Sequence, residues 1–378
     1  MTSTSSRHQL VQRTIAPPTL RRQKTAIFVA ATAFAAVAAL VLGMWLGGNL
    51  TQSTINGLAL GGTGSLTDWG LPASKLVMDV SSLGVIGMLV VCLLLPAREP
   101  AAEASAVTQR LLRTATWLAV AWAISNAALL LFSWSNVVAQ PVTELPIARL
   151  FTDTTAAFPA AADFISSTAL ALVIAAGIAV TKTRRGAWIL LPLAGYNLVP
   201  MALQGHAAHG TLLKYSLITH IIAISLWVGG LAALVTHVRN EPALLGVAAP
   251  RFSTLALACY TAVAASGIVA AWKLLGSIPA LWGSRYGVLI MLKAAALITL
   301  GVFGWWHRRH TIARIRTKQG TRSRRAFVQL AAAEVAIMVA AVAIAVALSR
   351  SASPDTIVLH SGRQASAPAH YTQPTTRA

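Results

Sequence analysis

Long apolar stretches dominate this sequence and restrict the folds that it can adopt. A lipid bilayer has a hydrocarbon core roughly 30 Å thick, and an α-helix needs about 20 mostly apolar residues to cross it. Nine stretches meet this requirement, near residues 25–46, 75–96, 114–138, 159–181, 187–204, 212–238, 252–275, 286–306 and 326–349. Because 56% of the 378 residues are hydrophobic and 11% are charged, an ordinary soluble domain is excluded. We predict an all-α fold, a polytopic bundle of about nine transmembrane helices.

The basic residues lie mainly in alternate connections between these stretches. If the N-terminus is inside the cell, 21 of the 30 Lys and Arg residues fall in cytoplasmic segments and eight fall outside. Cytoplasmic loops of membrane proteins carry an excess of Lys and Arg. The pattern predicts a cytoplasmic N-terminus and an external C-terminus, in the cytoplasmic membrane. It also accounts for the formal net charge of +20, so membrane lipid is the expected partner and nucleic acid is not.

The same pattern divides the chain into four parts. Residues 1–24 form a basic cytoplasmic segment, 25–204 a membrane region of five helices, 205–349 a membrane domain of four helices, and 350–378 a disordered external tail. The first apolar stretch is long for a signal peptide, so we expect an uncleaved anchor. The two cysteines show no CxxC spacing, which gives no support for a disulfide framework or a thiolate metal motif.

A few polar side chains lie inside the predicted spans, where they cost free energy and usually face the bundle interior. They are Asp79, Asn126, Asp163, Tyr196, Asn197, His220, Lys293 and Glu334. Hydrogen bonds between helices explain most of them, and a structural or relay role is open for Asp79, Tyr196 and Asn197. Lys293 and Glu334 enter the membrane from opposite faces, and a Lys side chain can span the vertical gap between them. This predicts an ion pair between the last two spans, with either a structural role or a role in a proton or ion relay.

Three histidines occur at and just inside the start of the sixth span, in the string GHAAHGTLLKYSLITH. Imidazole is the commonest metal ligand in proteins. His206 and His209 are three residues apart in an external connection and would chelate one ion if that turn is helical. His220 lies eleven residues beyond His209, about 16 Å deeper along a continuous helix. The spacing favours two metal positions in series over one site with three histidines.

The facing fifth span offers further groups at matching depths. Met201 falls about half-way between the outer histidines and His220. Tyr196 and Asn197 fall near the level of His220. Imidazole suits copper and zinc alike, whereas a thioether is a soft ligand that selects Cu(I). The histidine pair, Met201 and His220 would therefore form a stepwise path for copper. The alternative is that Met201 only packs and that His220 only hydrogen-bonds Asn197 or Tyr196.

Three more histidines lie toward the cytoplasmic face. His307 and His310 flank the basic string RR and favour contact with solvent or lipid headgroups. His237, at the inner end of the sixth span, is a candidate exit contact for a metal ion.

Four strings in the second half of the sequence match a known pattern: THIIAISLWVGGLAAL, RFSTLALACYTAVAASGIVAAW, YGVLIMLKAAALITLGVFGWWHRR and AAAEVAIMVAAVAIAVALSRSASP. They contain His220, Trp227, Gly229 and Gly230 as H-x6-W-x-G-G, then Arg251, Phe252, Ser253, Gly267, Tyr286, Gly287, Lys293 and Glu334. Over residues 205–354 the chain resembles the copper resistance D (CopD) family of polytopic membrane proteins. The first five spans resemble, more loosely, the additional N-terminal helices of actinobacterial members.

This resemblance implies copper handling across the cytoplasmic membrane, with inward movement of copper ions, as Cu(I) or Cu(II), and no enzymatic activity. It singles out His220 as a copper contact. Trp227 would wall the imidazole off from lipid, and Gly229 and Gly230 would let a neighbouring helix approach closely. An external copper chaperone or a membrane oxidase is the expected protein partner.

Two alternatives stay open. The chain could be a copper donor or assembly factor for a membrane oxidase, or a haem-binding electron-transfer protein. The haem hypothesis needs two histidines at one depth on facing helices, and His220 is the only deep one in the predicted spans.

Overall fold

The computed structural model describes residues 18–46, 54–55, 58–59, 63–96, 101–145, 160–181, 183–202, 210–275, 278–306 and 321–350, together with Phe158 and Arg309. These residues form α-helices, short 3-10 and π-helical segments, and one antiparallel pair of two-residue strands. The predicted all-α class is confirmed for this part of the chain. The predicted segment 1–24 lies mostly, and the predicted tail 350–378 almost entirely, outside the described residues.

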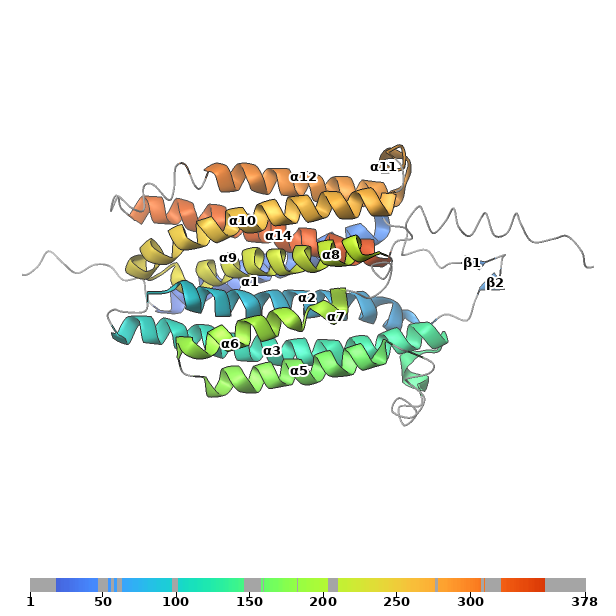
Figure 1. The fold of residues 1–378 in the computed structure, drawn as a ribbon, viewed down its shortest axis with the longest axis horizontal. Helices are drawn as coiled ribbons and strands as arrows, with labels where there is room; N and C mark the ends of the chain where they lie inside the picture. The colour runs from blue at the N-terminus through green and yellow to red at the C-terminus, as the bar shows by residue number, and fades with distance from the viewer. Residues whose placement is uncertain are drawn as a thin grey trace, which may run out of the picture.

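The elements follow one another along the chain, and their bounds are these. They are α1 (Pro18–Leu46), β1 (Thr54–Ile55), β2 (Leu58–Ala59), α2 (Ser65–Leu94), α3 (Ala101–Val138), the 3-10 turn η1 (Val142–Glu144), α5 (Ala161–Val180), α6 (Arg184–Tyr196), α7 (Val199–Ala202), α8 (Thr211–Ile224), the π-helical η4 (Ser225–Gly229), α9 (Gly230–Ala233), the π-helical η5 (Leu234–Val238), α10 (Pro242–Leu275), α11 (Ala280–Gly283), α12 (Arg285–Trp306) and α14 (Thr321–Arg350). Figure 1 shows the long helices lying side by side along the long axis of the molecule, with the connections at its two ends.

Seven helical segments among the described residues are long and apolar enough to cross a membrane. They are Ser65–Leu94, Ala106–Val138, Ala161–Val180, Thr211–Val238, Pro242–Lys273, Tyr286–Trp306 and Gln329–Ala347. The chain is therefore a multi-pass membrane protein. The first and fifth predicted spans are the two that this length criterion does not include, so a total of nine stays a prediction.

These two segments are helical but shorter where they are described. Ala30–Leu46, within α1, is an apolar helix below the length criterion. The fifth span is broken at Asn197 and Leu198, between α6 and α7. Pro200 has no N–H to donate to the carbonyl four residues earlier, and proline is tolerated in the first turn of a helix, where α7 places it. The predicted continuous span is therefore two helices in the structure.

The helix α2 lies at the centre of the packing. It contacts α3, α6, η4 and α9, while α8 packs on α10, and α1 and α12 both pack on α14. From Leu83 to Cys92, α2 is buried on all sides, with only Gly84 partly exposed. Cys92 and Cys259 are both buried free thiols, as expected from their spacing.

Two glycines form the closest helix crossing in the core. Gly87 of α2 and Gly229 of η4 meet backbone to backbone, so a methyl group on either would overlap main-chain atoms of the other helix. Gly229 would meet the Leu83 carbonyl, and Gly230 would meet the Phe252 ring. Small residues at such crossings let membrane helices approach closely. The role predicted for Gly229 and Gly230 is confirmed.

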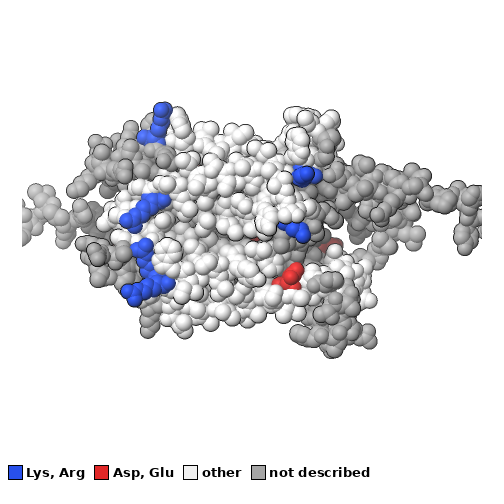
Figure 2. Space-filling view, viewed as in Figure 1, with Lys and Arg blue, Asp and Glu red and all other residues white. Residues whose placement is uncertain are grey.

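The outer surface has the polarity of a membrane protein. Large apolar side chains such as Ile268 and Trp272 of α10 are exposed, and so are Ile298 and Val302 of α12. In Figure 2 the Lys and Arg side chains gather at the two ends and leave the broad middle of this face without them. A surface of this kind is stable in contact with lipid tails and not with water.

Two arginines close the C-terminal end of α2. Arg184 donates from Nη1 to the Leu95 carbonyl at 3.0 Å and from Nη2 to the Leu93 carbonyl at 2.5 Å. Arg251 donates to the Leu94 carbonyl at 2.9 Å. The last carbonyls of a helix have no partner within it, and cations are favoured beside them. These two residues therefore stabilise the end of α2 that the sequence places in the cytoplasm.

Candidate metal centre

His220 lies well inside the bundle, on α8. It is nine residues after the first residue of α8, Thr211, which corresponds to about 13 Å of helix. Ser266 of α10 is nine residues before Leu275, and Lys293 of α12 is eight residues after Arg285. Since these helices start or end at the same side of the bundle in Figure 1, the three side chains share one depth. They define a polar layer in an otherwise apolar region.

Hydrogen bonds join His220 to α10. Its Nδ1 atom lies 2.9 Å from Ser266 Oγ. Ser266 Oγ in turn donates to the Ala262 carbonyl at 2.6 Å, with the Val263 carbonyl at 3.1 Å. One turn before His220, Ser216 Oγ donates to the Ser266 carbonyl at 2.9 Å. The imidazole is thus fixed between two helices by a short chain of buried polar groups.

This chain determines which ring nitrogen carries the proton. A serine hydroxyl has one proton, and Ser266 directs it to backbone carbonyls. Its oxygen can therefore only accept from His220, so Nδ1 is the protonated nitrogen of the neutral ring. Among the described side chains, the hydrogen-bond partner of the ring is Ser266 at Nδ1, so Nε2 is the nitrogen that remains for a metal ion. A hydrogen bond at one ring nitrogen that leaves the other free is the usual arrangement of a metal-ligating histidine.

The surroundings of the ring are compact. Gly267 lies under it, because a Cβ atom at Gly267 would be 3.8 Å from His220 Cε1. Seven residues further along, Trp227 is buried and makes an edge-to-face contact with Tyr260, with ring centroids 5.5 Å apart. Its predicted role of shielding the imidazole stays a prediction, since its ring contact is with Tyr260.

Lys293 is close enough to His220 for the two side chains to interact electrostatically. A positive charge there opposes the binding of a metal cation to Nε2. Metal binding is therefore favoured when an anionic group balances Lys293. Glu334 of α14 is buried, and α14 packs on α12. Within the described part of the chain, ion pairs join Lys75 to Asp79, and Arg110 to Glu241 at 3.0 Å. The pair between Lys293 and Glu334 stays a prediction.

A double-mutant cycle tests that pair. We expect Lys293→Met or Glu334→Leu alone to lower the free energy of unfolding in detergent by about 2.5 kcal/mol, because each single change leaves one charge in an apolar region. The double variant should lose less than the sum of the two. Strictly additive losses would show that the two side chains do not interact.

The structure gives Asn197 and Tyr196 a different role from the one considered in the sequence. Asn197 donates to the Ser167 carbonyl at 3.2 Å, on the α5 side of the bundle, and the Tyr196 side chain is 64% exposed. The suggestion that His220 hydrogen-bonds one of them is wrong, because its partner is Ser266. The depth along the helices places Asn197, Tyr196 and His220 at one level, but it does not give the directions in which their side chains point.

The remaining predicted ligands cannot be compared with this geometry. His206 and His209 lie outside the described residues, and so does the side chain of Met201, although its backbone belongs to α7. Within the part of the chain that is described, no three His, Cys, Asp or Glu side chains form a group that could hold a metal ion. Between the helix break and α8 there is a crevice without room for a water molecule, lined by Leu198, Val199, Ile218, Ile221 and Ile222. These apolar side chains supply no ligand.

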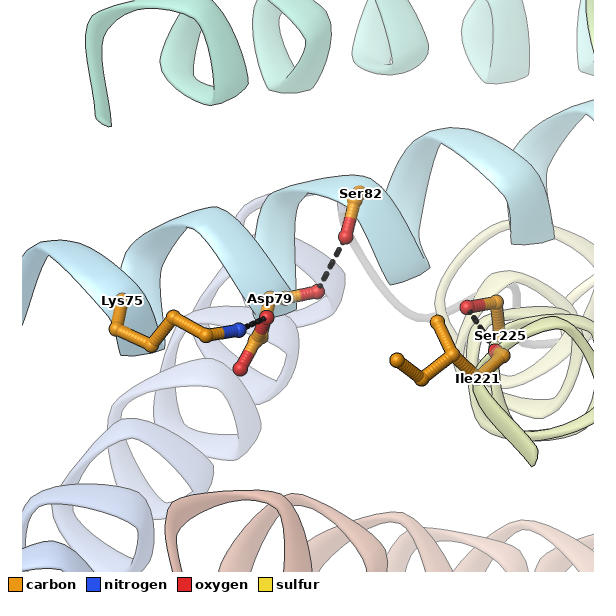
Figure 3. A network of polar contacts seen from close by, with 5 residues as sticks. All are labelled: Lys75, Asp79, Ser82, Ile221 and Ser225. Carbon is orange, nitrogen blue, oxygen red and sulfur yellow. Dashed lines mark hydrogen bonds and ion pairs between the residues drawn. The ribbon is translucent and has the colours of Figure 1, made fainter. Parts of the chain in front are cut away.

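Asp79 is satisfied on its own helix. It pairs with Lys75 one turn earlier, and Ser82 donates to the Asp79 carbonyl at 2.9 Å. Figure 3 shows these groups along α2, with Ser225 of η4 bonded to Ile221 nearby. An ion pair within one helix is a structural arrangement, and it provides no contact to His220.

His237 differs from His220 in one decisive respect. Its Nε2 lies 3.0 Å from Thr114 Oγ1, and its Nδ1 lies 2.7 Å from Thr236 Oγ1. Both ring nitrogens are therefore engaged with hydroxyl groups. A metal would have to displace one of these bonds, so the geometry gives no support to the predicted exit contact at His237.

Two family models match the chain. One is described as Copper resistance protein D and covers residues 246–348. The other is described as Copper resistance protein D-like, N-terminal domain, and covers residues 66–214. The chain belongs to the copper resistance protein D family. Neither the curated proteins nor the solved structures compared with it include a significant match.

The residues of the candidate centre fall in different parts of the two family matches. Ser266, Lys293 and Glu334 fall in the copper resistance protein D match, and the outer histidines fall at the end of the N-terminal match. His220 lies in 215–245, between the two. Family membership therefore points to copper as the metal involved, while the argument for His220 depends on its hydrogen bond to Ser266 and its place between α8 and α10.

Sequence reasoning missed Ser216 and Ser266. Serine is common in membrane helices and carries no charge, so neither residue stood out among the polar positions. A signal was nevertheless present, since Ser216 is four residues before His220 and Ser266 directly precedes Gly267. Only the packing of α8 on α10 shows that these residues meet.

Proposed function

We propose that this membrane protein of the copper resistance protein D family moves copper ions inward across the cytoplasmic membrane, with His220 as the ligand inside the bundle. The observation that carries the proposal is the free Nε2 of a histidine whose other nitrogen is fixed by Ser266. His206 and His209 form an outer capture site, and Met201 is a soft ligand between the two positions. Copper is the cargo, and no bond of a substrate is made or broken.

Cellular copper accumulation tests this proposal. Cells that lack the protein are compared with cells that express it at equal level, over a range of external copper. Expression should raise cell-associated copper and should increase sensitivity to excess copper. Unchanged accumulation at every concentration would contradict inward movement.

A second function is favoured by one observation. His237, at the inner end of the sixth span, is engaged at both ring nitrogens and offers no free imidazole there. This arrangement fits a protein that binds copper from outside and donates it to a membrane oxidase or its assembly partner. In that case, removal of the protein should lower the copper content of the oxidase and leave total cell copper unchanged. A haem centre is disfavoured, because it needs a second histidine at the depth of His220, and the other histidine among the described residues, His237, has both ring nitrogens engaged.

Replacement of Ser266 tests the role of its hydroxyl. We expect Ser266→Ala to weaken copper binding by about 10–100-fold, the usual effect of removing the hydrogen-bond partner of a metal ligand. Affinity is measured by competition with a coloured Cu(I) chelator. Ser266→Thr, which keeps a hydroxyl, should restore most of the affinity. Ser216→Ala is the matched control, since it breaks a neighbouring bond without touching the ring, and an equal loss in both Ala variants would contradict this role.

The orientation in the membrane is tested with reporters. A reporter that works only in the cytoplasm should be inactive when fused after Ala378 and active when fused before Met1. This follows from an odd number of spans and from the excess of basic residues in alternate connections. Activity of that reporter after Ala378 would contradict the predicted external C-terminus.

A further inference from the structure

A second buried polar cluster lies in the N-terminal half of the bundle, away from His220. It joins Asn126 of α3, Ser167 of α5 and Asn197, the residue that follows α6. Asn126 is 0% exposed and the other two are each 1% exposed. Asn126 donates from Nδ2 to Ser167 Oγ at 2.9 Å, and Asn197 donates from Nδ2 to the Ser167 carbonyl at 3.2 Å. Both amides are therefore oriented by one residue.

The two amide oxygens have no protein partner. Among the described residues, Oδ1 of Asn126 and Oδ1 of Asn197 are buried without a hydrogen bond. An unsatisfied buried polar group costs about 1–3 kcal/mol. An amide that is already held through its nitrogen cannot turn its oxygen elsewhere without losing that bond. Both oxygens must therefore lie near Ser167, and both are acceptors.

Unused donors accompany these acceptors. Trp122 lies one helical turn before Asn126 on α3, so the two residues share a face of the helix, and its indole N–H is also buried without a partner. Ser167 Oγ accepts from Asn126 and retains its own hydroxyl proton. The cluster thus presents two acceptors and two donors. A ligand that matches it must offer two donors and two acceptors.

We propose that one water molecule binds between Asn126, Ser167 and Asn197, where it donates to the two amide oxygens and accepts from the indole and the hydroxyl. Water has this set of donors and acceptors, and buried waters in proteins typically make about three hydrogen bonds. A sodium or potassium ion would also suit two amide oxygens. It would, however, face the indole N–H, and the cluster contains no carboxylate to balance its charge.

The proposed water lies next to the break between α6 and α7, where it would stabilise the fold. Asn197 stands at the break between α6 and α7, where the helical hydrogen-bond pattern is interrupted. The water ties this break to α3 and α5 and satisfies polar groups that lipid cannot. All three cluster residues fall within the family's N-terminal match, so the site belongs to that domain and is separate from the proposed copper path.

Radiolytic hydroxyl-radical labelling of the full chain in detergent tests the proposal. A bound water generates radicals in place, so buried Trp122 should be oxidised faster than Trp227, which is buried beside Tyr260 and has no such cluster. After rapid mixing with oxygen-18 water, the oxygen-18 label should appear only slowly in oxidised Trp122, because a buried water exchanges slowly with the solvent. Equal slow oxidation of both indoles in the unmodified protein would overturn the proposal without any variant.

Two further arms complete the test. The double change Asn126→Leu and Asn197→Leu removes both acceptors and should reduce Trp122 oxidation to the rate of Trp227. The same measurement in sodium, potassium and choline salts addresses an ion. Oxidation of Trp122 that is suppressed by sodium or potassium, relative to choline, would show that a cation occupies the site and would refute the water.

Discussion

The His220→Gln variant is expected to bring copper accumulation down to the level of cells without the protein, while its amount in the membrane stays normal. Glutamine can still donate a hydrogen bond to Ser266 Oγ, so the contact between α8 and α10 is kept. An amide is, however, a far poorer copper ligand than an imidazole. The loss of copper affinity should exceed about 100-fold, the upper range for outer hydrogen-bond partners of a ligand.

The matched control for this variant is His237→Gln. His237 lies on the same continuous membrane span, but both of its nitrogens are engaged by Thr114 and Thr236. Copper accumulation should stay close to normal in this variant. If His220→Gln accumulates copper normally, or if the two variants lose activity equally, the deep ligand is not His220.

The second large effect concerns the crossing of α2 and η4. We expect Gly229→Ala to lower the free energy of unfolding by about 4 kcal/mol, above the usual cost of overpacking, because the new methyl group meets backbone and not a movable side chain. Thermal unfolding in detergent, followed by tryptophan fluorescence, measures the change. The expression level in the membrane should fall in parallel.

Gly246→Ala is the control for this prediction. Gly246 lies on α10, and a Cβ atom there would meet nothing within 4 Å. Alanine has the higher helix propensity, so this variant should be unchanged or slightly more stable. A Gly229→Ala protein as stable as Gly246→Ala would mean that the two helices are further apart than the structure places them.

The helical architecture was predictable because it depends on local composition. Runs of about 20 apolar residues leave an α-helix as the only way to satisfy the backbone in lipid, whatever the neighbours are. Seven of the predicted spans correspond to long apolar helices. The break at Asn197 was not predicted, since Pro192 and Pro200 are both compatible with a kinked but continuous membrane helix.

The candidate centre was predictable only in part. His220 stood out because a deep imidazole is rare in a membrane span, and the structure places it partly buried between α8 and α10. Its partner could not be found, because sequence separation gives depth but not the direction in which a side chain points. Asn197 and His220 share a level, yet one faces Ser167 and the other Ser266. The choice among helix pairs depends on long-range packing.

The most direct test of the central claim is X-ray absorption spectroscopy on the purified full-length protein loaded with one equivalent of Cu(I). The His206→Ala, His209→Ala background removes the outer pair, so any imidazole bound to copper must come from elsewhere in the chain. We expect an imidazole scattering signature in this background and its loss when His220→Gln is added. Copper that keeps the imidazole signature without His220, or that shows none with His220 present, would contradict the account.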